Sequence, residues 1–336
     1  MRNHESAQNN SDAKLSQLPA RCYLPAMQHC LPQYLLISLI FTAFSSLLLV
    51  APAQAQGNGP GVRGARAAAL GNASVALAGE LWSMGNNAAG LGEIQQPTVG
   101  FYAENRYFSP ALNVAALTMA LPLGRVAAPR AAMAADAAIP NLAGRTWARH
   151  GVVAFEVQRF GGQLYNETRF GAGYGYRFGQ ISLGGRVDVL QVSIEGLGSR
   201  RVVLGTLGGQ IEIVPQRLSF GAALYNINQA RLASYQDERV PTVLKAGLAY
   251  RPSTQVLLVV ETEKDVERDA NFKAGLEYRP VPVLAARLGL ASLTKQASAG
   301  IGVLAGTFQI DYAAAFQQAL GFSQHLSVSK TWGRDN

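Results

Sequence analysis

The sequence predicts an all-β protein: a transmembrane up-and-down antiparallel β-barrel of about 14 strands, preceded by a short N-terminal plug-like segment. The composition, a strict period-two alternation and the length of the alternating segments support this fold class. Of the 336 residues, 49% are hydrophobic, only 15% are charged and 35 are glycine. A disordered chain would contain fewer apolar residues, and a coiled coil would carry far more charge. Beyond residue 55, no uninterrupted apolar stretch is long enough for a membrane-spanning helix.

An apolar run near the N-terminus indicates a signal peptide. The run occupies residues 35–50, and Ala53 and Ala55 follow it with the small-x-small spacing of a signal-peptidase site. We therefore expect residues 1–55 to be a cleaved signal peptide, whose start is over-extended if translation begins at Met27. Such a protein is exported, and we expect to find it in the outer membrane of a Gram-negative bacterium.

The rest of the chain divides into three parts. Residues 56–97 are rich in alanine and other small residues, and we expect short helices that are interrupted at Gly71 and Gly79. This segment is too small to form a domain, so we expect it to plug the barrel; a free periplasmic tail that docks onto a partner is the alternative. Residues 98–332 form the predicted barrel, and residues 333–336 form a short tail.

Apolar and polar residues alternate strictly from about residue 98 onward. A helix of period 3.6 cannot reproduce this pattern, which predicts strands. In residues 271–279, for example, Phe272 and Leu276 alternate with Lys273 and Glu277. Most alternating segments have the roughly 9–11 residues that a tilted strand needs to cross a bilayer. The predicted strands are 98–108, 110–121, 149–160, 167–178, 180–196, 200–213, 216–229, 241–251, 254–264, 270–279, 282–293, 295–304, 306–316 and 322–332.

The connections between these strands fall into two classes. Tight turns such as 178–180 and 251–253 alternate with longer loops such as 161–167 and 230–240. Short periplasmic turns and longer outer loops are typical of outer-membrane barrels. Residues 122–148 depart from this pattern, because a short turn is expected there. Either they are a periplasmic insertion or the first predicted strands are miscounted.

Charged residues on the strands should point into the barrel, because hydrocarbon cannot solvate a charge. Neighbouring strands then present opposite charges, which predicts cross-strand ion pairs. These charges either line a pore or form a structural network that fills a narrow barrel. The predicted lumen-lining charges are Lys245, Arg251, Glu261, Glu263, Lys273, Glu277, Arg279, Arg287 and Asp311.

Glycines recur on the predicted inner face, at Gly171, Gly173, Gly175 and Gly247. The absence of side chains at these positions leaves room for another part of the chain to approach the wall closely. The N-terminal segment is the obvious candidate. The alternative is that these glycines relieve crowding where the barrel curves.

The sequence contains no motif that indicates catalysis or a cofactor. There is no G-x-S-x-G, P-loop or H-E-x-x-H sequence, so we predict that the protein is not an enzyme and binds no cofactor. Cys22 and Cys30 precede the apolar run and would leave with the signal peptide. The formal net charge is +8, but the basic residues are scattered singly, so nucleic acid is not an expected partner. The expected partner is outer-membrane lipid.

Several stretches together resemble the PorV/PorQ-like outer-membrane barrels, which are relatives of the FadL transporters. The resemblance covers roughly residues 62–332, and its individual motifs are loose, whereas their order along the chain is specific. Ala88 stands where the family usually has proline. The similar stretches are 65–74, 87–91, 241–252, 275–278, 286–289, 309–313 and 320–327.

The resemblance implies a fourteen-stranded barrel and two functions. One is a protein-secretion component of the type IX kind, or another partner-binding component, with secretion-machinery or cargo proteins as partners. The alternative is a FadL-like channel for hydrophobic small molecules. Because the clearest strands carry paired charges on the inner face and no inward apolar patch, the sequence favours the first function.

Overall fold

The computed structural model describes residues 59–127, 146–148, 150–232 and 239–332. The predicted signal peptide at 1–55 and the tail at 333–336 lie outside the described residues. Among the residues that are described, no helix is long and apolar enough to cross a membrane.

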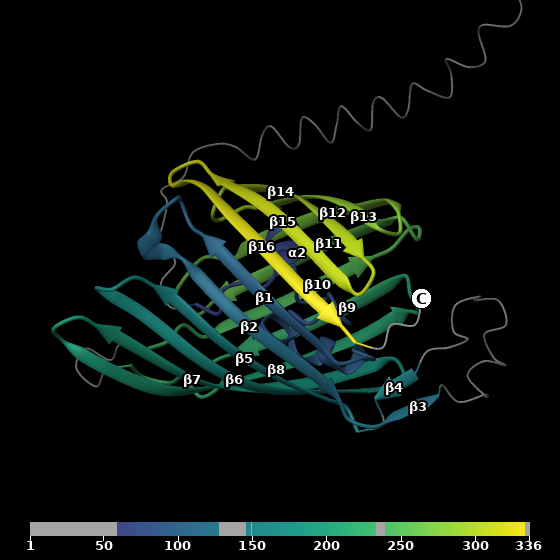
Figure 1. The fold of residues 1–336 in the computed structure, drawn as a ribbon, viewed down its shortest axis with the longest axis horizontal. Coiled ribbons are helices and arrows are strands. Elements are labelled where there is room, and N and C mark those ends of the chain that lie inside the picture. The colour runs from purple at the N-terminus through teal and green to yellow at the C-terminus, as the bar shows by residue number, and fades with distance from the viewer. Residues whose placement is uncertain (1–58, 128–145, 149, 233–238, 333–336) are drawn as a thin grey trace, which may run out of the picture. The chain divides into compact units, whose positions relative to one another are not determined.

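Within the described residues, fourteen strands form one closed antiparallel barrel, which β1 and β16 close by pairing with each other (Figure 1). The predicted fold class and strand number are therefore confirmed, and each barrel strand overlaps one predicted segment. The barrel strands are β1 (Thr98–Asn105), β2 (Val114–Pro122), β5 (Val152–Gly161), β6 (Tyr165–Phe178), β7 (Ile181–Ile194), β8 (Gly198–Val214), β9 (Leu218–Tyr225), β10 (Val243–Tyr250), β11 (Val256–Asp265), β12 (Asn271–Val281), β13 (Leu284–Ala291), β14 (Gln296–Ala305), β15 (Phe308–Gln317) and β16 (Gly321–Thr331).

The long connection at 122–148 is an insertion, because the strand count on either side of it is as predicted. Two short strands in it, β3 (Arg125–Ala127) and β4 (Thr146–Ala148), pair with each other outside the barrel. Residues 128–145 lie outside the described residues. The insertion leaves the barrel at the end where β1 begins and β16 ends.

Two predicted strands extend three or more residues beyond the observed end. The first was expected to reach residue 108, but β1 ends at Asn105, and Tyr107 and Phe108 both have a φ of 55°, which a strand does not allow. The seventh was expected to reach residue 229, but β9 ends at Tyr225. Asn226 has a φ of 56°, and its buried side chain donates to the carbonyl of Val240. These backbone conformations are set by loop contacts that alternation does not encode.

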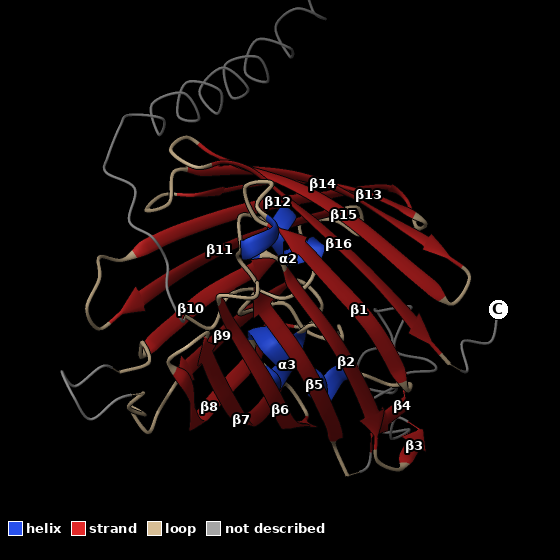
Figure 2. Ribbon diagram, turned by 60° about the vertical axis from the view of Figure 1, so that its left-hand side comes forward, coloured by secondary structure: helices blue, strands red, loops and turns tan. Residues whose placement is uncertain are grey.

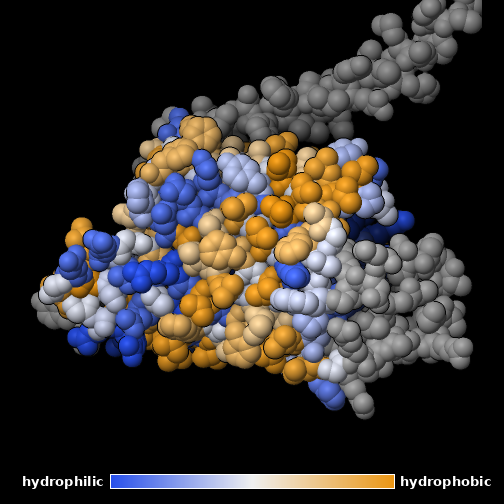
Figure 3. Space-filling model, in the orientation of Figure 1, coloured by the Kyte–Doolittle hydropathy of each residue, from blue (hydrophilic) through white to orange (hydrophobic). Residues whose placement is uncertain are grey.

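The outer face of the barrel is apolar across the middle of the strands. Leu276 is the central residue of β12 and lies in register with Leu258 of β11 and Leu288 of β13. All three are exposed, at 39–52% of their surface. Hydrophobic residues spread across the middle of the face shown in Figure 3. Such a belt is the surface that a membrane-spanning barrel turns to lipid.

The N-terminal segment, residues 59–97, lies inside the barrel (Figure 2). It contains α2 (Ala65–Ala69), α3 (Ser83–Asn86) and a 3₁₀ helix, η1 (Ala88–Glu93). The first helix ends where Gly71 turns the chain with a φ of 68°. A second 3₁₀ helix, η2 (Pro110–Leu112), lies in the loop between β1 and β2. Most side chains of the segment are buried between it and the inner wall.

Three of the four predicted inward glycines face the N-terminal segment. A Cβ atom at Gly173 would overlap the side chain of Met84, and one at Gly175 would overlap η1. Gly247 lies against Val75 in the same way. Gly171 differs, because the space beside it is filled by Arg186 and Asp188 of the neighbouring strand β7.

We expect the Leu276→Arg substitution to destabilise the barrel by about 2–4 kcal/mol, because it places a charge in the middle of the lipid-facing belt. Urea titration of refolding into lipid vesicles, read from the gel mobility of unboiled protein, measures this change. Val266→Arg is the matched control, since Val266 lies in the loop after β11 and is 73% exposed. Equal effects of the two substitutions would contradict the assignment of the lipid-facing side.

Candidate functional site

The first ionic cluster inside the barrel is centred on Glu277 of β12. Its carboxylate accepts two hydrogen bonds from Arg66 of α2, at 2.8 and 3.0 Å, and others from the Nε atoms of Arg287, at 2.7 Å, and Arg279, at 2.9 Å. Arg287 also donates to Asp311 of β15, with 2.7 Å between Nη1 and Oδ1. The cluster therefore joins the N-terminal segment to three strands of the wall.

The second ionic cluster is centred on Glu261 of β11. Its Oε2 atom accepts hydrogen bonds from the backbone N–H groups of Ser74 and Val75, at 2.7 and 2.8 Å. Its Oε1 atom lies 3.0 Å from Nζ of Lys273, which also contacts Glu263 at 2.7 Å. A buried carboxylate here holds the backbone of the N-terminal segment directly, and such charge-assisted bonds are stronger than neutral ones.

Six of the nine predicted lumen charges are buried, whereas Arg251, Glu263 and Arg279 are half-buried. Lys245 completes the second cluster, since its Nζ atom lies 3.2 Å from Glu263. Arg251, just beyond the end of β10, belongs to neither cluster. The structure thus brings eight of the nine residues into two groups: Lys245, Glu261, Glu263 and Lys273 in one, and Glu277, Arg279, Arg287 and Asp311 in the other.

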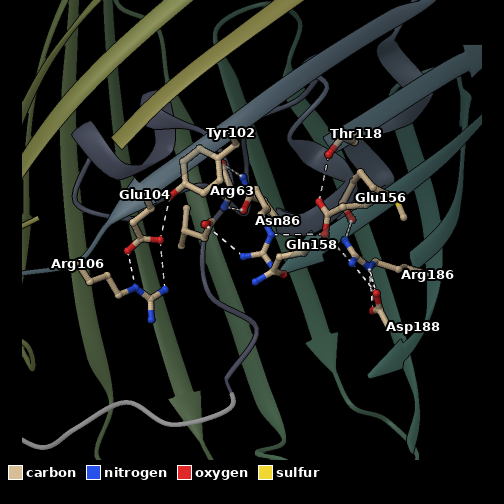
Figure 4. Close-up of polar contacts among 12 residues, drawn as sticks. Arg63, Asn86, Tyr102, Glu104, Arg106, Thr118, Glu156, Gln158, Arg186 and Asp188 are labelled. Atoms are coloured by element: carbon tan, nitrogen blue, oxygen red, sulfur yellow. Dashed lines mark hydrogen bonds and ion pairs between the residues drawn. The ribbon is translucent and has the colours of Figure 1, made fainter. Parts of the chain in front are cut away.

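A third ionic cluster was not predicted (Figure 4). Glu156 of β5 accepts hydrogen bonds from Arg186 of β7, at 2.8 Å, and from Arg63 of the N-terminal segment, at 3.4 Å. Arg186 also donates to Asp188, and Arg63 to Gln158. The signal was present, because Glu156, Arg186 and Asp188 alternate with apolar residues in their strands. The sequence does not show which of them pair, because Glu156 and Arg186 lie on strands that are not neighbours and Arg63 lies in the N-terminal segment.

A polar network on β1 and β16 lies beside the third cluster. The hydroxyl group of Tyr102 lies 3.1 Å from Oε2 of Glu104 and 2.9 Å from Nδ1 of His325. Arg106 contacts the same Glu104 carboxylate at 2.5 Å. Across the described part of the chain, no group of three or more His, Cys, Asp or Glu side chains is arranged to hold a metal ion.

A cavity of about 730 Å³ opens at the end of the barrel opposite the insertion. The loops after β1 and β5 form its rim, and the start of the N-terminal segment forms part of its lining. Ligand pockets are commonly about 300–1,000 Å³ and combine an apolar lining with a few polar groups. We call it the mouth cavity; its apolar lining includes Leu112, Phe160 and Leu164, and its cationic lining consists of Arg63, Arg106 and Arg169.

Comparisons with known proteins identify the fold. The toluene transporter TodX of Pseudomonas putida aligns with a TM-score of 0.52 at 12% identity, over 84% of this chain and 98% of that one. A TodX deltaS2 mutant, described as a monoaromatic hydrocarbon channel, aligns with a TM-score of 0.52 at 11% identity, over 80% and 97%. A FadL homologue of Pseudomonas aeruginosa has a TM-score of 0.49 at 10% identity, over 84% and 99%. No protein-family model matches the chain, and no curated protein matches it.

The fold thus defines the class of the protein: a closed fourteen-stranded barrel that resembles the TodX barrel at low sequence identity. The N-terminal segment occupies the lumen, and the mouth cavity lies beside the start of this segment, at the end of the barrel formed by the loops after β1 and β5.

We expect the Glu261→Gln substitution to loosen the N-terminal segment while the barrel stays folded. A charged acceptor contributes roughly 1.5–3 kcal/mol to a hydrogen bond and a neutral one about 0.5–1.5 kcal/mol. The loss of about 1–2 kcal/mol corresponds to about tenfold faster amide hydrogen exchange at Ser74 and Val75.

Glu263→Gln is the matched control for this measurement. Glu263 forms ion pairs with Lys245 and the same Lys273, both of which belong to the wall rather than to the N-terminal segment. If this control raised exchange at Ser74 and Val75 as much as Glu261→Gln does, general loosening of the cluster would explain the effect.

Proposed function

We propose that this protein is an outer-membrane channel for hydrophobic small molecules, and that the N-terminal segment closes it in the conformation described here. The observation that carries the proposal is the mouth cavity, a partly apolar pocket at one end of the barrel whose lining includes the start of the segment, residues 59–61 and Arg63. A molecule that enters this cavity meets the segment next, so passage requires the segment to shift.

The ionic clusters do not argue against a channel. On the sequence alone, the paired inward charges favour a secretion component, because a passage for apolar molecules should have an apolar lining. In the structure, however, each cluster contacts the N-terminal segment: Glu277 binds Arg66, Glu261 binds the Ser74 amide and Glu156 binds Arg63. These contacts support the interpretation that the charges anchor the segment rather than line an open pore.

The outer membrane of a Gram-negative bacterium is the location that fits these features. The apolar belt requires lipid around the barrel, and closed barrels with short turns at one end are typical of that membrane. A cleaved signal peptide at residues 1–55 would deliver the chain there. The expected role in type IX protein secretion has no support in the comparisons, which favour the alternative.

Small aromatic hydrocarbons are the first substrates to test. The two TodX structures are described as a toluene transporter and a monoaromatic hydrocarbon channel. The apolar side of the mouth cavity, with Phe160, Leu112 and Leu164, suits a molecule of that kind.

We expect a covalent lock between the N-terminal segment and the wall to stop uptake. Ala65, Ala68 and Ala69 of α2 form an apolar cluster with Ala313 of β15. Ala313→Cys is combined with a cysteine at each α2 position in turn, and the pair that forms a disulfide on oxidation is kept. Toluene uptake is measured in a Gram-negative strain that lacks its own hydrocarbon channel. Uptake by the oxidised protein should fall to the level of cells without it, and a reductant should restore it.

The single Ala313→Cys variant controls for the substitution and for the oxidant. Uptake that persists at full rate with the segment locked would show that the segment does not close the passage. No uptake above background by the unmodified protein, for toluene or for other small hydrocarbons, would rule out the proposed substrate class.

A further inference from the structure

A small second cavity lies deeper in the barrel than the mouth cavity. It has a volume of about 20 Å³, which is room for one group the size of a water molecule. Arg169 and Pro60 line both cavities, so the two are neighbours. On one side it is bounded by residues of the N-terminal segment, including Asn87, and on the other by the wall.

Three polar atoms of the lining lack a hydrogen-bond partner among the described residues. They are Nε of Arg169 on β6, Oγ1 of Thr206 on β8 and the hydroxyl oxygen of Tyr225 on β9. Thr206 and Tyr225 lie directly opposite each other in the pairing of β8 with β9. The guanidinium group of Arg169 lies 5.7 Å from the centre of the Tyr225 ring. Arg169 is only 4% exposed and Tyr225 only 5%. Such buried orphan atoms are rare, because each costs free energy unless an occupant satisfies it.

The free groups in this cavity can all donate, whereas the side-chain oxygen atoms of Asp188 and Asn87 beside it already accept hydrogen bonds. The N–H of Arg169 can only donate, and the two hydroxyl groups can rotate to donate. Asp188 accepts hydrogen bonds from Arg186, and the Oδ1 atom of Asn87 accepts one from Ala89. An occupant that accepts several hydrogen bonds and offers none fits this arrangement better than water does.

The charge of the lining also favours an anion. Its charged side chains are three cations, Arg169, Arg186 and Lys245, and one carboxylate, Asp188. Outside the lining, Glu156 and Glu263 pair with Arg186 and Lys245, at 2.8 and 3.2 Å. Asp188, Glu156 and Glu263 contact Arg186 or Lys245, and none of these three carboxylates contacts Arg169 directly.

We propose that Arg169, Thr206 and Tyr225 form a binding site for a small monoanionic group at the inner end of the mouth cavity. A halide ion satisfies this chemistry, and so does the carboxylate of a larger molecule whose body lies in the mouth cavity. The site does not depend on the proposed function, because it requires binding but no passage.

Thermal unfolding of the detergent-solubilised protein tests the site, since a ligand that binds the folded state raises the unfolding temperature. Chloride, bromide and benzoate are compared with gluconate, a bulky anion, at equal ionic strength. The wild-type protein should be stabilised relative to gluconate. Stabilisation by the halides shows a free-anion site, and stabilisation by benzoate alone shows a site for the carboxylate of a larger ligand.

Arg169→Gln should weaken anion binding at least about tenfold, because it removes a charge-assisted donor. Arg159→Gln is the matched control, since Arg159 lies on the neighbouring strand β5 but is exposed on the outer face. Tyr225→Phe removes one donor and leaves Arg169 in place, so it tests the site even if Arg169→Gln fails to fold.

Two results would overturn the inference. One is a wild-type protein that no small anion stabilises more than gluconate does, which would leave the cavity to water. The other is a full anion effect in both the Arg169→Gln and Tyr225→Phe proteins. Neither result bears on toluene uptake, so failure of this site and failure of the proposed channel are distinguishable.

Discussion

The pairing of buried charges is the constraint on which the interior of this barrel depends. In the part of a closed barrel that lies within the membrane, strict alternation leaves a charged side chain only one place to point, away from lipid. Charge that is removed from water must then be paired. The wall supplies part of this pairing between neighbouring strands, and the N-terminal segment supplies the rest: Arg66 to Glu277, Arg63 to Glu156, and backbone amides to Glu261. Each cluster is therefore built by the wall and the segment together.

These ion pairs fix the position of the N-terminal segment more than they stabilise the folded protein. Buried ion pairs contribute little net free energy once desolvation is counted, whereas a wrongly placed charge costs several kcal/mol. The three clusters contact the segment at different residues, Arg66, Ser74 with Val75, and Arg63, so they define where along the inner wall the segment can lie. The inward glycines allow its backbone to come close, as at Gly175 beside η1 and Gly275 beside Leu70. Apolar contacts, such as those of Leu70 and Leu77 with Ala249 and Val259, then bury apolar surface between the segment and the wall, which stabilises this arrangement.

The barrel could be predicted from the sequence because the alternation of apolar and polar residues is read from sequence neighbours alone. In a closed membrane barrel the apolar face of each strand must meet lipid, so the direction of each side chain follows. Lys273 and Glu277 alternate with Phe272 and Leu276, and no tertiary contact is needed to read their faces. The ends of β1 and β9 could not be read, because they depend on loop contacts such as that of Asn226 with Val240. The third cluster and the orphan atoms of the small cavity depend on strand neighbours and on how the segment threads the lumen. Short alanine-rich helices carry no periodic signal that fixes such a path.

The same charges also limit how the proposed channel opens. If the whole N-terminal segment withdrew, the three clusters would lose their inner partners and water would enter a charged lumen. That lumen would suit ions better than hydrocarbons. A shift restricted to the residues beside the mouth cavity, 59–63, would break only the contacts of Arg63 and leave Glu277 and Glu261 bound to the rest of the segment. The proposed passage for an apolar molecule therefore runs alongside the anchored segment, between it and the wall, rather than through an emptied barrel.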